Sequence, residues 1–315
     1  MNEFESCLQK VRVALQGLSE ASLEEKPLPF GRQFKLARGK DKAALSVYSG
    51  KKGISLVWGG QAGDLLAEAQ RAVGVTGAVS VKKKGEQPLL MPTLLEDCAG
   101  FKGLWAGSDE SGKGDFFGPL VVAAVLLDLD TAKALQEEGV RDCKSLTDKE
   151  VKRQAPLIRK LAPLHAVLAL KPEFYNLRYG QLKQKNKNLN HLLANGHVTA
   201  LRDVLQKRPD CNYALIDRFA VASGIREALE KEFPSVIVVE QKQAERDTAV
   251  AAASVLARAR FLEIMEELSA AAGCILPKGG GSEATATAQR ILTEQGDDVL
   301  NKLVKKHFAN YKRLK

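Results

Sequence analysis

The sequence predicts a mixed α/β protein in two parts: a small unit with an antiparallel sheet, followed by a larger sheet covered by helices. Two observations lead to this prediction. The N-terminal part contains short strand-like runs separated by charged, glycine-bearing turns, whereas the remainder alternates strand-like and helical patterns. Strands followed by an alternation of strands and helices are typical of a mixed sheet with helices on its faces. The length of 315 residues and the hydrophobic content of 45% are sufficient for two domains with buried cores.

The N-terminal unit is expected over residues 1–85. Residues 4–18 alternate like a short amphipathic helix, and the two prolines and the glycine of "LEEKPLPFG" predict a break after it. Strands are predicted at "QFKLAR", "AALSVYSG" and "GISLVWGG", followed by a helix at "AGDLLAEAQRAV" and a strand at "GAVSVKKKG". This order predicts a short antiparallel meander.

Residues 86–102 are expected to form a linker, because they contain two prolines and show no clear period. The larger unit is expected over residues 103–315. Its predicted strands are "LWAGSD", "FGPLVVAAVLLD", "HAVLALK", "NYALIDRF" and "SVIVVEQK". Helices are predicted at "TDKEVKRQAPLIRKL", "NLNHLLANGHVTALRDVLQ" and "ASGIREALEKEF", and a long alanine-rich helix is predicted from about residue 247 to 272.

The charge balance favours a polyanionic partner. The chain carries 47 Lys and Arg against 38 Asp and Glu, a formal net charge of +9, and nucleic acid is the first partner that such an excess indicates. Residues 26–60 concentrate this excess, with eight basic side chains against the single acid Asp41. They are either solvated strands and turns or a basic face that contacts phosphates. The candidates for phosphate contact are Lys35, Lys51 and Lys52.

Composition also narrows the compartment and the chemistry. No stretch is apolar over the roughly 18 residues of a membrane span, and the N-terminus lacks the pattern of a signal peptide. The five cysteines are scattered, and the four histidines lack a metal-ligand spacing. We therefore expect a cytoplasmic protein without membrane contact, and catalysis that depends on carboxylates. His197 is expected to pack or to cap a helix, and Trp58 and Trp105 are expected in the core.

Two adjacent carboxylates lie in "AGSDESGKGDFFGPLVVAAVLL", where Asp109 and Glu110 precede Gly112 and Gly114. Consecutive side chains of a strand point to opposite faces, so the pair converges only if the strand ends there. Glycine reaches backbone angles that other residues avoid, so the two glycines predict that end. The sequence thus predicts two carboxylates at a strand end beside a glycine-rich turn.

Two further acids have similar settings. Asp217 ends the apolar run "YALI", and Asp247 opens the alanine-rich helix. Each has a structural alternative: Asp217 would pair with Arg218, and Asp247 would cap the helix N-terminus. If the acids share one cleft, two charges 4 Å apart repel by about 4 kcal/mol at an effective dielectric near 20, which requires cations or shared protons. Oxygen-only clusters suit Mg²⁺ or Mn²⁺, and two such ions support in-line attack of water on a phosphodiester.

The residues around these acids resemble a known family. "GSDESGKGDFFGPLVVAA" is similar to the opening motif of the type 2 ribonucleases H, in which an Asp-Glu pair precedes Gly-x-Gly. Its continuation from Asp115 to Pro119 is similar to that of the ribonuclease HIII branch. "GVRDCKSLTD", "YALIDRFA" and "QAERDTAVAAASVLARARFL" resemble later motifs of the family, and the N-terminal unit resembles its TATA-binding-protein-like domain. The resemblance covers nearly the whole chain.

The resemblance implies a ribonuclease H-like mixed sheet flanked by helices, preceded by a small α+β TATA-binding-protein-like domain. It implies endonucleolytic hydrolysis of the RNA strand of RNA–DNA hybrids with two Mg²⁺ or Mn²⁺ ions, leaving 5′-phosphate and 3′-hydroxyl ends. The backbone of Gly112, Lys113 and Gly114 would read the ribose 2′-hydroxyl, which separates RNA from DNA, and Lys144 would approach the phosphates. We expect a monomer without an obligate protein partner. The implied catalytic metal ligands are Asp109, Glu110, Asp217 and Asp247.

Two residues depart from the family pattern: Cys143, where serine is more common, and Asn195, where an aromatic residue is expected. Three alternatives remain. The same acids would serve an enzyme similar to ribonuclease HII that incises at a single ribonucleotide embedded in DNA, although the N-terminal unit favours the hybrid nuclease. A proofreading-type exonuclease would start with Asp-x-Glu rather than adjacent Asp-Glu. A nucleic-acid-binding protein with structural acids would lack one or more of the four carboxylates.

Overall fold

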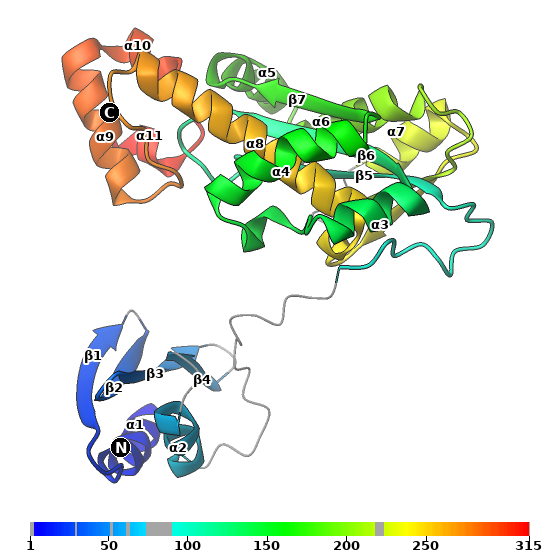
Figure 1. Cartoon of the computed structure of the whole chain (residues 1–315). Coiled ribbons are helices and arrows are strands. Elements are labelled where there is room, and N and C mark those ends of the chain that lie inside the picture. The colour runs from blue at the N-terminus through cyan, green and yellow to red at the C-terminus, as the bar shows by residue number, and fades with distance from the viewer. Residues whose placement is uncertain are drawn as a thin grey trace. The chain divides into compact units, whose positions relative to one another are not determined.

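Figure 1 shows the protein as a computed structural model, in which the chain divides into two compact units, Met1–Glu86 and Gln87–Lys315. The residues that the structure describes are 3–28, 30–50, 53–60, 64–73, 90–217 and 224–314. Among them, no helix combines the length and the apolar composition of a membrane-spanning segment. The predicted strand "GAVSVKKKG" lies outside the described residues, as do Lys51 and Lys52.

The N-terminal unit is an antiparallel sheet with helices packed against it, which confirms the predicted α+β class. Along β2, Lys35 is exposed between the buried Phe34 and Leu36, so one face of the sheet is apolar. Leu8 and Leu15 of the first helix complete the core on that face. The strands pair in the order β1-β2-β3-β4. The elements are α1 (Glu3–Gln16), β1 (Ser22–Leu28), β2 (Gly31–Arg38), β3 (Asp41–Gly50), β4 (Gly53–Gly60) and α2 (Asp64–Ala72).

The first helix ends before "LEEKPLPFG", as predicted, but most of that segment lies in strand β1, which the sequence analysis does not predict. Its residues pair with β2 along their whole length, with Pro27 opposite Arg32. Proline has no N–H to donate, so within sheets it is confined to edges, strand starts and bulges. Pro27 fits because β1 is the edge strand of this sheet.

The larger unit is built around a five-stranded mixed sheet, as predicted. The strands are β5 (Leu104–Ser111), β6 (Leu120–Asp128), β7 (His165–Leu170), β8 (Tyr213–Asp217) and β9 (Ile237–Gln241), in the order β7-β6-β5-β8-β9. β6 is antiparallel to both β5 and β7, whereas β5, β8 and β9 run parallel. The C-terminal ends of β5, β7, β8 and β9 therefore lie at one edge of the sheet, which we call the carboxyl edge.

Helices cover both faces of this sheet (Figure 1). Successive strand residues point to opposite faces of the sheet. Trp105 and Leu215 lie in the hydrophobic core between the sheet and α8, whereas Ala106 and Ile216 lie in the core between the sheet and α6. One face carries α3 (Leu129–Glu137), α4 (Asp148–Leu161) and α8 (Thr248–Ala271), and the other carries α6 (Leu189–Leu205) and α7 (Ile225–Glu232). The remaining helices are α5 (Pro172–Gln184), α9 (Ser282–Gln295), α10 (Asp297–Asn301) and α11 (Ala309–Arg313). Trp58 and Trp105 are both buried, as predicted.

Residues 90–102, which the sequence assigns to a linker, pack on the larger unit. The N–H of Met91 donates to the carbonyl oxygen of Arg246 (2.7 Å), and the Thr248 hydroxyl donates to the carbonyl oxygen of Met91 (2.8 Å). Leu95 is fully buried in the core with α8. The segment lacks a helical or strand period because it follows the surface of the unit in an irregular path.

Candidate active site

The adjacent carboxylates lie near the end of β5, on opposite faces of the sheet. The strand does not end at the pair, because Glu110 pairs with Val122 and Ser111 with Val121 of β6. The strand ends one residue after the pair and directly before Gly112, as the glycines predict, but the predicted convergence of the two side chains is wrong, because the antiparallel partner keeps the backbone extended. Alternation then directs the two side chains to opposite faces, Asp109 toward α8 and Glu110 toward α6.

Asp109 and Asp217 are brought together on the α8 face. Two residues before Asp109, Gly107 lies so close to α8 that an added Cβ would be 2.5 Å from a backbone nitrogen of that helix. β5 and β8 are parallel, with Ser108 opposite Ile216. Asp109 and Asp217 come next on each strand, so they lie at the same level, and both are half-buried. The structure thus places two carboxylates side by side at the carboxyl edge.

Further charges surround Asp109. Burial, together with the charges of Glu110 and Asp142, raises the pKa of Asp109 well above its usual range. Lys144 lies in the 3-10 turn Cys143–Ser145. Burial alone lowers the pKa of Lys144, but the charges of Asp142, Asp109 and Glu245 raise it above its usual value. A cation and several acids therefore share this side of the carboxyl edge.

Ser254 of α8 holds the loop that carries Asp142 and Lys144. Its hydroxyl donates to Oδ1 of Asp142 (3.1 Å) and accepts the N–H of Cys143 (3.0 Å). Cys143 stands where the family pattern has serine. Burial and the charge of Asp142 raise the pKa of its thiol to about 12, so the group stays protonated. The loop is anchored to Ser254 through the backbone N–H of Cys143 and the carboxylate of Asp142.

Glu110 meets a buried histidine on the α6 face. The Nε2 atom of His197 lies 3.2 Å from Oε2 of Glu110, and its Nδ1 atom lies 2.8 Å from the Ser108 hydroxyl. Lys113 Nζ lies 3.6 Å from Oε1 of the same carboxylate. Burial alone raises the pKa of Glu110, but the hydrogen bond to His197 and the nearby positive charge lower it below its usual value. His197 is packed in α6, as predicted, and it also fixes a carboxylate of the site, which the sequence did not indicate.

Asp247 has a structural role instead of the predicted metal-binding role. It is the N-cap of α8: its Oδ1 accepts the N–H of Ala249 (2.8 Å) and the indole N–H of Trp105 (2.9 Å), and its Oδ2 accepts the N–H of Leu94 (3.0 Å). The residue is fully buried, and burial raises its pKa to about 6. Because both oxygens accept bonds from inside the protein, neither faces the carboxyl edge. This corrects the assignment of Asp247 as a metal ligand in favour of the capping alternative.

Glu245 is the acid that the sequence analysis missed. It lies in the 3-10 turn Ala244–Arg246, which follows β9 at the carboxyl edge, and it is half-buried. Its charge acts on Lys144, on which Asp109 acts as well. The capping signal for Asp247 was the clue, because an aspartate committed to a helix N-terminus leaves the acid two residues earlier available.

The two glycines after Glu110 differ in whether the fold itself requires a glycine at that position. Gly112 has a φ of +87°, and an added Cβ would lie 2.1 Å from the carbonyl oxygen of Pro119, so the fold requires glycine there. At the exposed Gly114, no described atom lies within 4 Å of an added Cβ. The fold therefore leaves residue 114 free, and a bare backbone at this position permits close approach by a ligand. Lys113, between them, is half-exposed.

The C-terminal part of the chain holds the turn that follows Gly114. Oδ1 of Asp115 accepts the N–H of Gly279 (2.6 Å), and Lys305 Nζ donates to the carbonyl oxygens of Asp115 (2.8 Å) and Phe117 (3.4 Å). Lys305 is fully buried, and burial lowers its pKa to about 7. The position of the turn therefore depends on residues far away in sequence.

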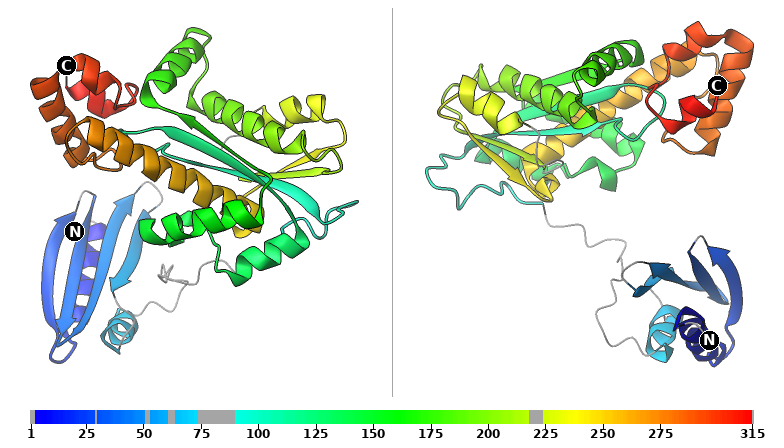
Figure 2. Two further views of the ribbon diagram at one scale, coloured as in Figure 1. Left: turned by 45° about the horizontal axis from the view of Figure 1, so that its top comes forward. Right: turned by 180° about the vertical axis from the view of Figure 1, so that it is seen from behind.

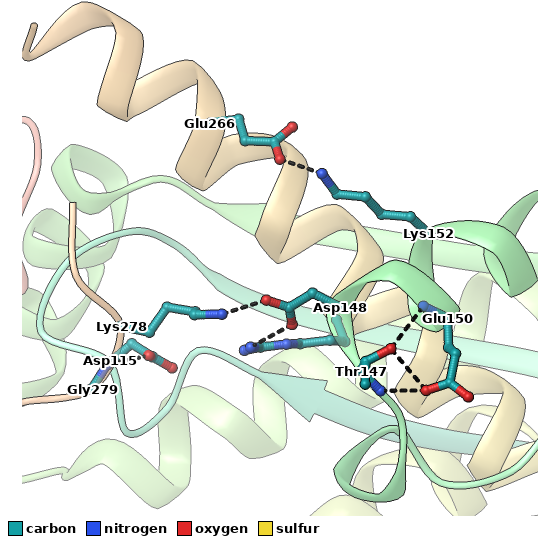
Figure 3. A network of polar contacts seen from close by, with 9 residues as sticks. Asp115, Thr147, Asp148, Glu150, Lys152, Glu266, Lys278 and Gly279 are labelled. Carbon is teal, nitrogen blue, oxygen red and sulfur yellow. Dashed lines mark hydrogen bonds and ion pairs between the residues drawn. The ribbon is translucent and has the colours of Figure 1, made fainter. Parts of the chain in front are cut away.

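A polar network beside this turn connects α4, α8 and the segment before α9 (Figure 3). Asp148 forms ion pairs with Arg258 of α8 (3.1 Å) and with Lys278, next to Gly279. Lys152 of α4 pairs with Glu266 of α8. These contacts fix the segment that receives Asp115.

Asn195 lines a cavity of about 540 Å³ between α6 and the strands β6 and β7. Gly196 brings the helix close to the sheet there, since an added Cβ would lie 2.8 Å from the side chain of Val122. A small polar residue in place of the expected aromatic one therefore coincides with open space in this part of the unit.

On the N-terminal unit, the exposed face of the sheet carries Lys35. Together with Lys42 and the acid Glu24, it lines a cavity of about 400 Å³ over strands β1 to β3. Lys51 and Lys52, the other two residues predicted to contact phosphates, lie outside the described residues.

Within the ranges that the structure describes, no three Asp, Glu, His or Cys side chains are grouped closely enough to hold a metal ion. The donor types nevertheless fit a hard divalent cation, because Asp109, Asp217 and Glu245 offer oxygen alone. Burial, together with the negative charges of Glu110 and Asp142, raises the pKa of Asp109, and a bound divalent cation would favour its charged form.

Comparison with known proteins gives consistent matches. The family model "Ribonuclease HII" matches residues 106–311. Ribonuclease HIII of Protochlamydia amoebophila (strain UWE25) is 38% identical over 202 residues, which span 64% of this chain and 65% of that protein. Ribonuclease HIII of Listeria monocytogenes serotype 4b (strain F2365) is 37% identical over 253 residues, 75% and 79% of the two chains. The crystal structure of Bst-RNase HIII in complex with Mn²⁺ is similar at a TM-score of 0.60 and 31% identity, covering 97% of this chain and 95% of that chain.

Proposed function

The chain belongs to the ribonuclease HII family, and from this premise we propose that it hydrolyses the RNA strand of RNA–DNA hybrids, leaving 5′-phosphate and 3′-hydroxyl ends. The observation that carries the proposal is the pair of carboxylates, Asp109 and Asp217, side by side at the ends of two parallel strands. Similarity to proteins named ribonuclease HIII, over both units in the case of Bst-RNase HIII, supports the hybrid as substrate.

The residues that would hold divalent metal ions are Asp109, Glu110, Asp217 and Glu245, with Glu245 in place of Asp247. An oxygen-only set suits Mg²⁺ or Mn²⁺, and the Mn²⁺ complex of Bst-RNase HIII supports the same ion class. Two such ions, when bound, activate the attacking water and stabilise the leaving 3′-oxygen. His197 and Ser108 orient the Glu110 carboxylate from the α6 side.

Two groups of this chain would bind the substrate next to the acids. Lys144 is exposed and lies near Asp109 and Glu245, so its ammonium group would contact a phosphate oxygen near the scissile bond. The backbone of Gly112, Lys113 and Gly114 would hydrogen-bond the ribose 2′-hydroxyl, which DNA lacks. The open space at Gly114 supports this role, because a side chain there would stand between the backbone and the ribose.

The N-terminal unit would contact the phosphates of the same hybrid. Lys35 and Lys42 lie on the exposed face of its sheet, and Lys51 and Lys52 extend the basic sequence of this region. Phosphate contacts of this kind add affinity without sequence preference.

Cleavage of three labelled duplexes of about 20 base pairs tests the proposal: an RNA–DNA hybrid, DNA with one embedded ribonucleotide, and DNA alone. Each is incubated with Mg²⁺, Mn²⁺ or EDTA. The variant Asp109→Asn should lose activity by a factor of about 100 or more, since one ligand of the site becomes neutral. Asp97→Asn, at an exposed acid of the same unit, is the matched control and should cleave like the wild type.

Metal-dependent cutting within the RNA strand supports the proposal. Preferential incision at the single ribonucleotide would move the function to the ribonuclease HII type with the same site. Tight binding without cleavage in any metal would refute the enzymatic proposal.

A further inference from the structure

One region of the larger unit is unusually free of negative charge. Residues 174–202 contain no Asp or Glu, although they include Arg178, Lys183, Lys185 and Lys187. The three lysines lie at and just after the end of α5 and are exposed. Within the described part of the chain, their ammonium groups make no ion pair. Some other exposed bases of this unit do form ion pairs, as Lys171 does with Glu267 (2.8 Å).

The three lysines are carried by an ordered turn, residues 183–187, which we call the lysine turn. Asn186 adopts a left-handed conformation (φ +55°). The N–H of Lys187 donates to the carbonyl oxygen of Leu182 (2.9 Å), and the N–H of Asn186 donates to that of Lys183 (3.0 Å), the pattern that closes a helix C-terminus. Asn188 then caps α6. Because the backbone is already fixed, binding through this turn costs little conformational entropy.

The lysine turn belongs to the end of the molecule that carries the acids. β7 ends at Leu170, opposite Leu120, and leads directly into α5 at the carboxyl edge. Asn176 of α5 hydrogen-bonds the carbonyl oxygen of Val304 (2.9 Å), and Figure 2 shows α5 beside the C-terminal helices in both views. From its first residue, Leu189, α6 runs about 12 Å along its axis to His197, which bonds Glu110.

We propose that the lysine turn is a separate contact surface for the backbone phosphates of the duplex, outside the cleavage site. A distance of about 12 Å corresponds to roughly three to four base pairs at about 3.4 Å per step. The contact would therefore lie on the order of three to four base pairs from the scissile phosphate. Lysines recognise phosphate as point charges and read no base edges, so this surface binds hybrid and DNA duplexes alike. This inference rests on the proposed function, which supplies the duplex as substrate.

The test variant replaces Lys183, Lys185 and Lys187 with Gln. The matched control replaces Lys102, Lys207 and Lys231 with Gln. These three are also exposed, but they lie next to the start of β5, the end of α6 and the end of α7, at the opposite edge of the sheet. Both variants change the net charge equally. Binding of a fluorescent 20-base-pair hybrid, and of the corresponding DNA duplex, is measured in EDTA by anisotropy between 50 and 200 mM KCl.

Each phosphate contact contributes about 0.9 to the slope of log affinity against log salt. For three contacts the slope of the test variant is smaller in magnitude by about 2.7. A fourfold rise in salt therefore weakens binding of the wild type by about 40-fold more than it weakens binding of the test variant. The control should keep the wild-type slope. At saturating hybrid, the cleavage rate of the test variant with Mn²⁺ should match the wild type, since no catalytic group changes.

An unchanged slope in the test variant, or an equal decrease in the control, would overturn the proposal. So would a decrease confined to the hybrid, because a phosphate contact cannot distinguish the two duplexes in this way. If wild-type protein cleaves the hybrid but the slopes agree, only the lysine turn is refuted. If wild-type protein fails to cleave the hybrid, the proposed function itself fails.

Discussion

In the proposed set of metal ligands, Glu245 takes the place of Asp247. The alanine variants of these two residues should therefore differ: one should lose mainly stability and the other mainly activity. In Asp247→Ala, four donors lose their acceptor: the indole N–H of Trp105 and the backbone N–H groups of Leu94, Ala249 and Val250. Each unsatisfied buried donor costs about 1–3 kcal/mol, and a lost N-cap costs about 0.5–2 kcal/mol. The bonds from Ala249 and Val250 are themselves the N-cap, so the cap is counted once, and we expect a loss of about 3–5 kcal/mol in the free energy of unfolding.

In Glu245→Ala, stability should change by less than about 0.5 kcal/mol, because the side chain is half-buried and makes no hydrogen bond with other described residues. Its cleavage activity should fall by a factor of about 100 or more, as for the loss of another metal ligand. For a unit of this size, about 1 kcal/mol shifts the unfolding midpoint by about 2–4 °C. Asp247→Ala should therefore unfold on the order of 10 °C below the wild type.

Thermal unfolding by circular dichroism and initial rates of hybrid cleavage, measured well below the lower midpoint, separate the two effects. Glu96→Ala, at an exposed acid of the same unit, is the control. The pH supplies a second signature: folded Asp247 keeps its proton up to about pH 6, above its usual pKa of 3.8. The wild type should thus lose stability as pH rises from about 4 to about 6, and Asp247→Ala should lack this loss. The reasoning is refuted if Asp247→Ala keeps the wild-type midpoint but loses cleavage while Glu245→Ala cleaves normally.

Three further predictions follow from the site. Gly112→Ala should lower the free energy of unfolding by about 2–4 kcal/mol, because Gly112 has a positive φ and an added Cβ would clash with Pro119. Gly114→Ala should unfold like the wild type but bind the hybrid more weakly than the wild type does. Equal stabilities of the two variants would argue against this distinction. His197→Ala should weaken Mn²⁺ binding, followed by electron paramagnetic resonance, by about 10–100-fold, with Ser108→Ala as the milder comparison and unchanged binding as the contrary result. Because folded Lys305 has a pKa of about 7 against a usual 10.5, wild-type stability should rise between about pH 7 and pH 10, and urea unfolding of Lys305→Met should show a flatter profile.

The sequence was sufficient for the class of the fold and for the positions of Asp109, Glu110 and Asp217 in the strands, because both depend on local patterns. Alternating apolar runs identified the strands, and Asp109, Glu110 and Asp217 lie at strand ends that those runs define. Asp247 and Glu245 are only two residues apart in one motif. Their roles differ because a 3-10 turn precedes the helix, and the sequence does not reveal whether that turn forms.

The other two errors of the sequence-based prediction share a different cause, which is pairing with a neighbouring strand. "LEEKPLPFG" follows the end of the helix, but its prolines hide the strand β1, which forms because it pairs with β2 as an edge strand. The glycines after Glu110 do end β5, yet β6 pairs with β5 as far as Ser111, so the backbone stays extended through Asp109 and Glu110 and their side chains do not converge. His197 and Lys305 escaped notice for a related reason, since their partners, Glu110 and the carbonyl oxygen of Asp115, are more than eighty residues away in the chain.

The arrangement of the site is set largely by α8, although that helix supplies none of the proposed metal ligands. Its cap, Asp247, fixes the start of the helix against Trp105, and Ser254, about two turns later, fixes the loop of Asp142 and Lys144. Further along, Phe261 fills the space that a side chain at Gly112 would need. Glu245 precedes the cap, so the same bond that anchors the helix also positions this acid. Hence Asp247→Ala should weaken metal binding by displacing Glu245 as well as destabilise the unit. A second mutation far from the helix that restores full stability separates this positioning effect from simple unfolding. If Mn²⁺ affinity does not recover in the stabilised variant, the loss comes from the displacement of Glu245.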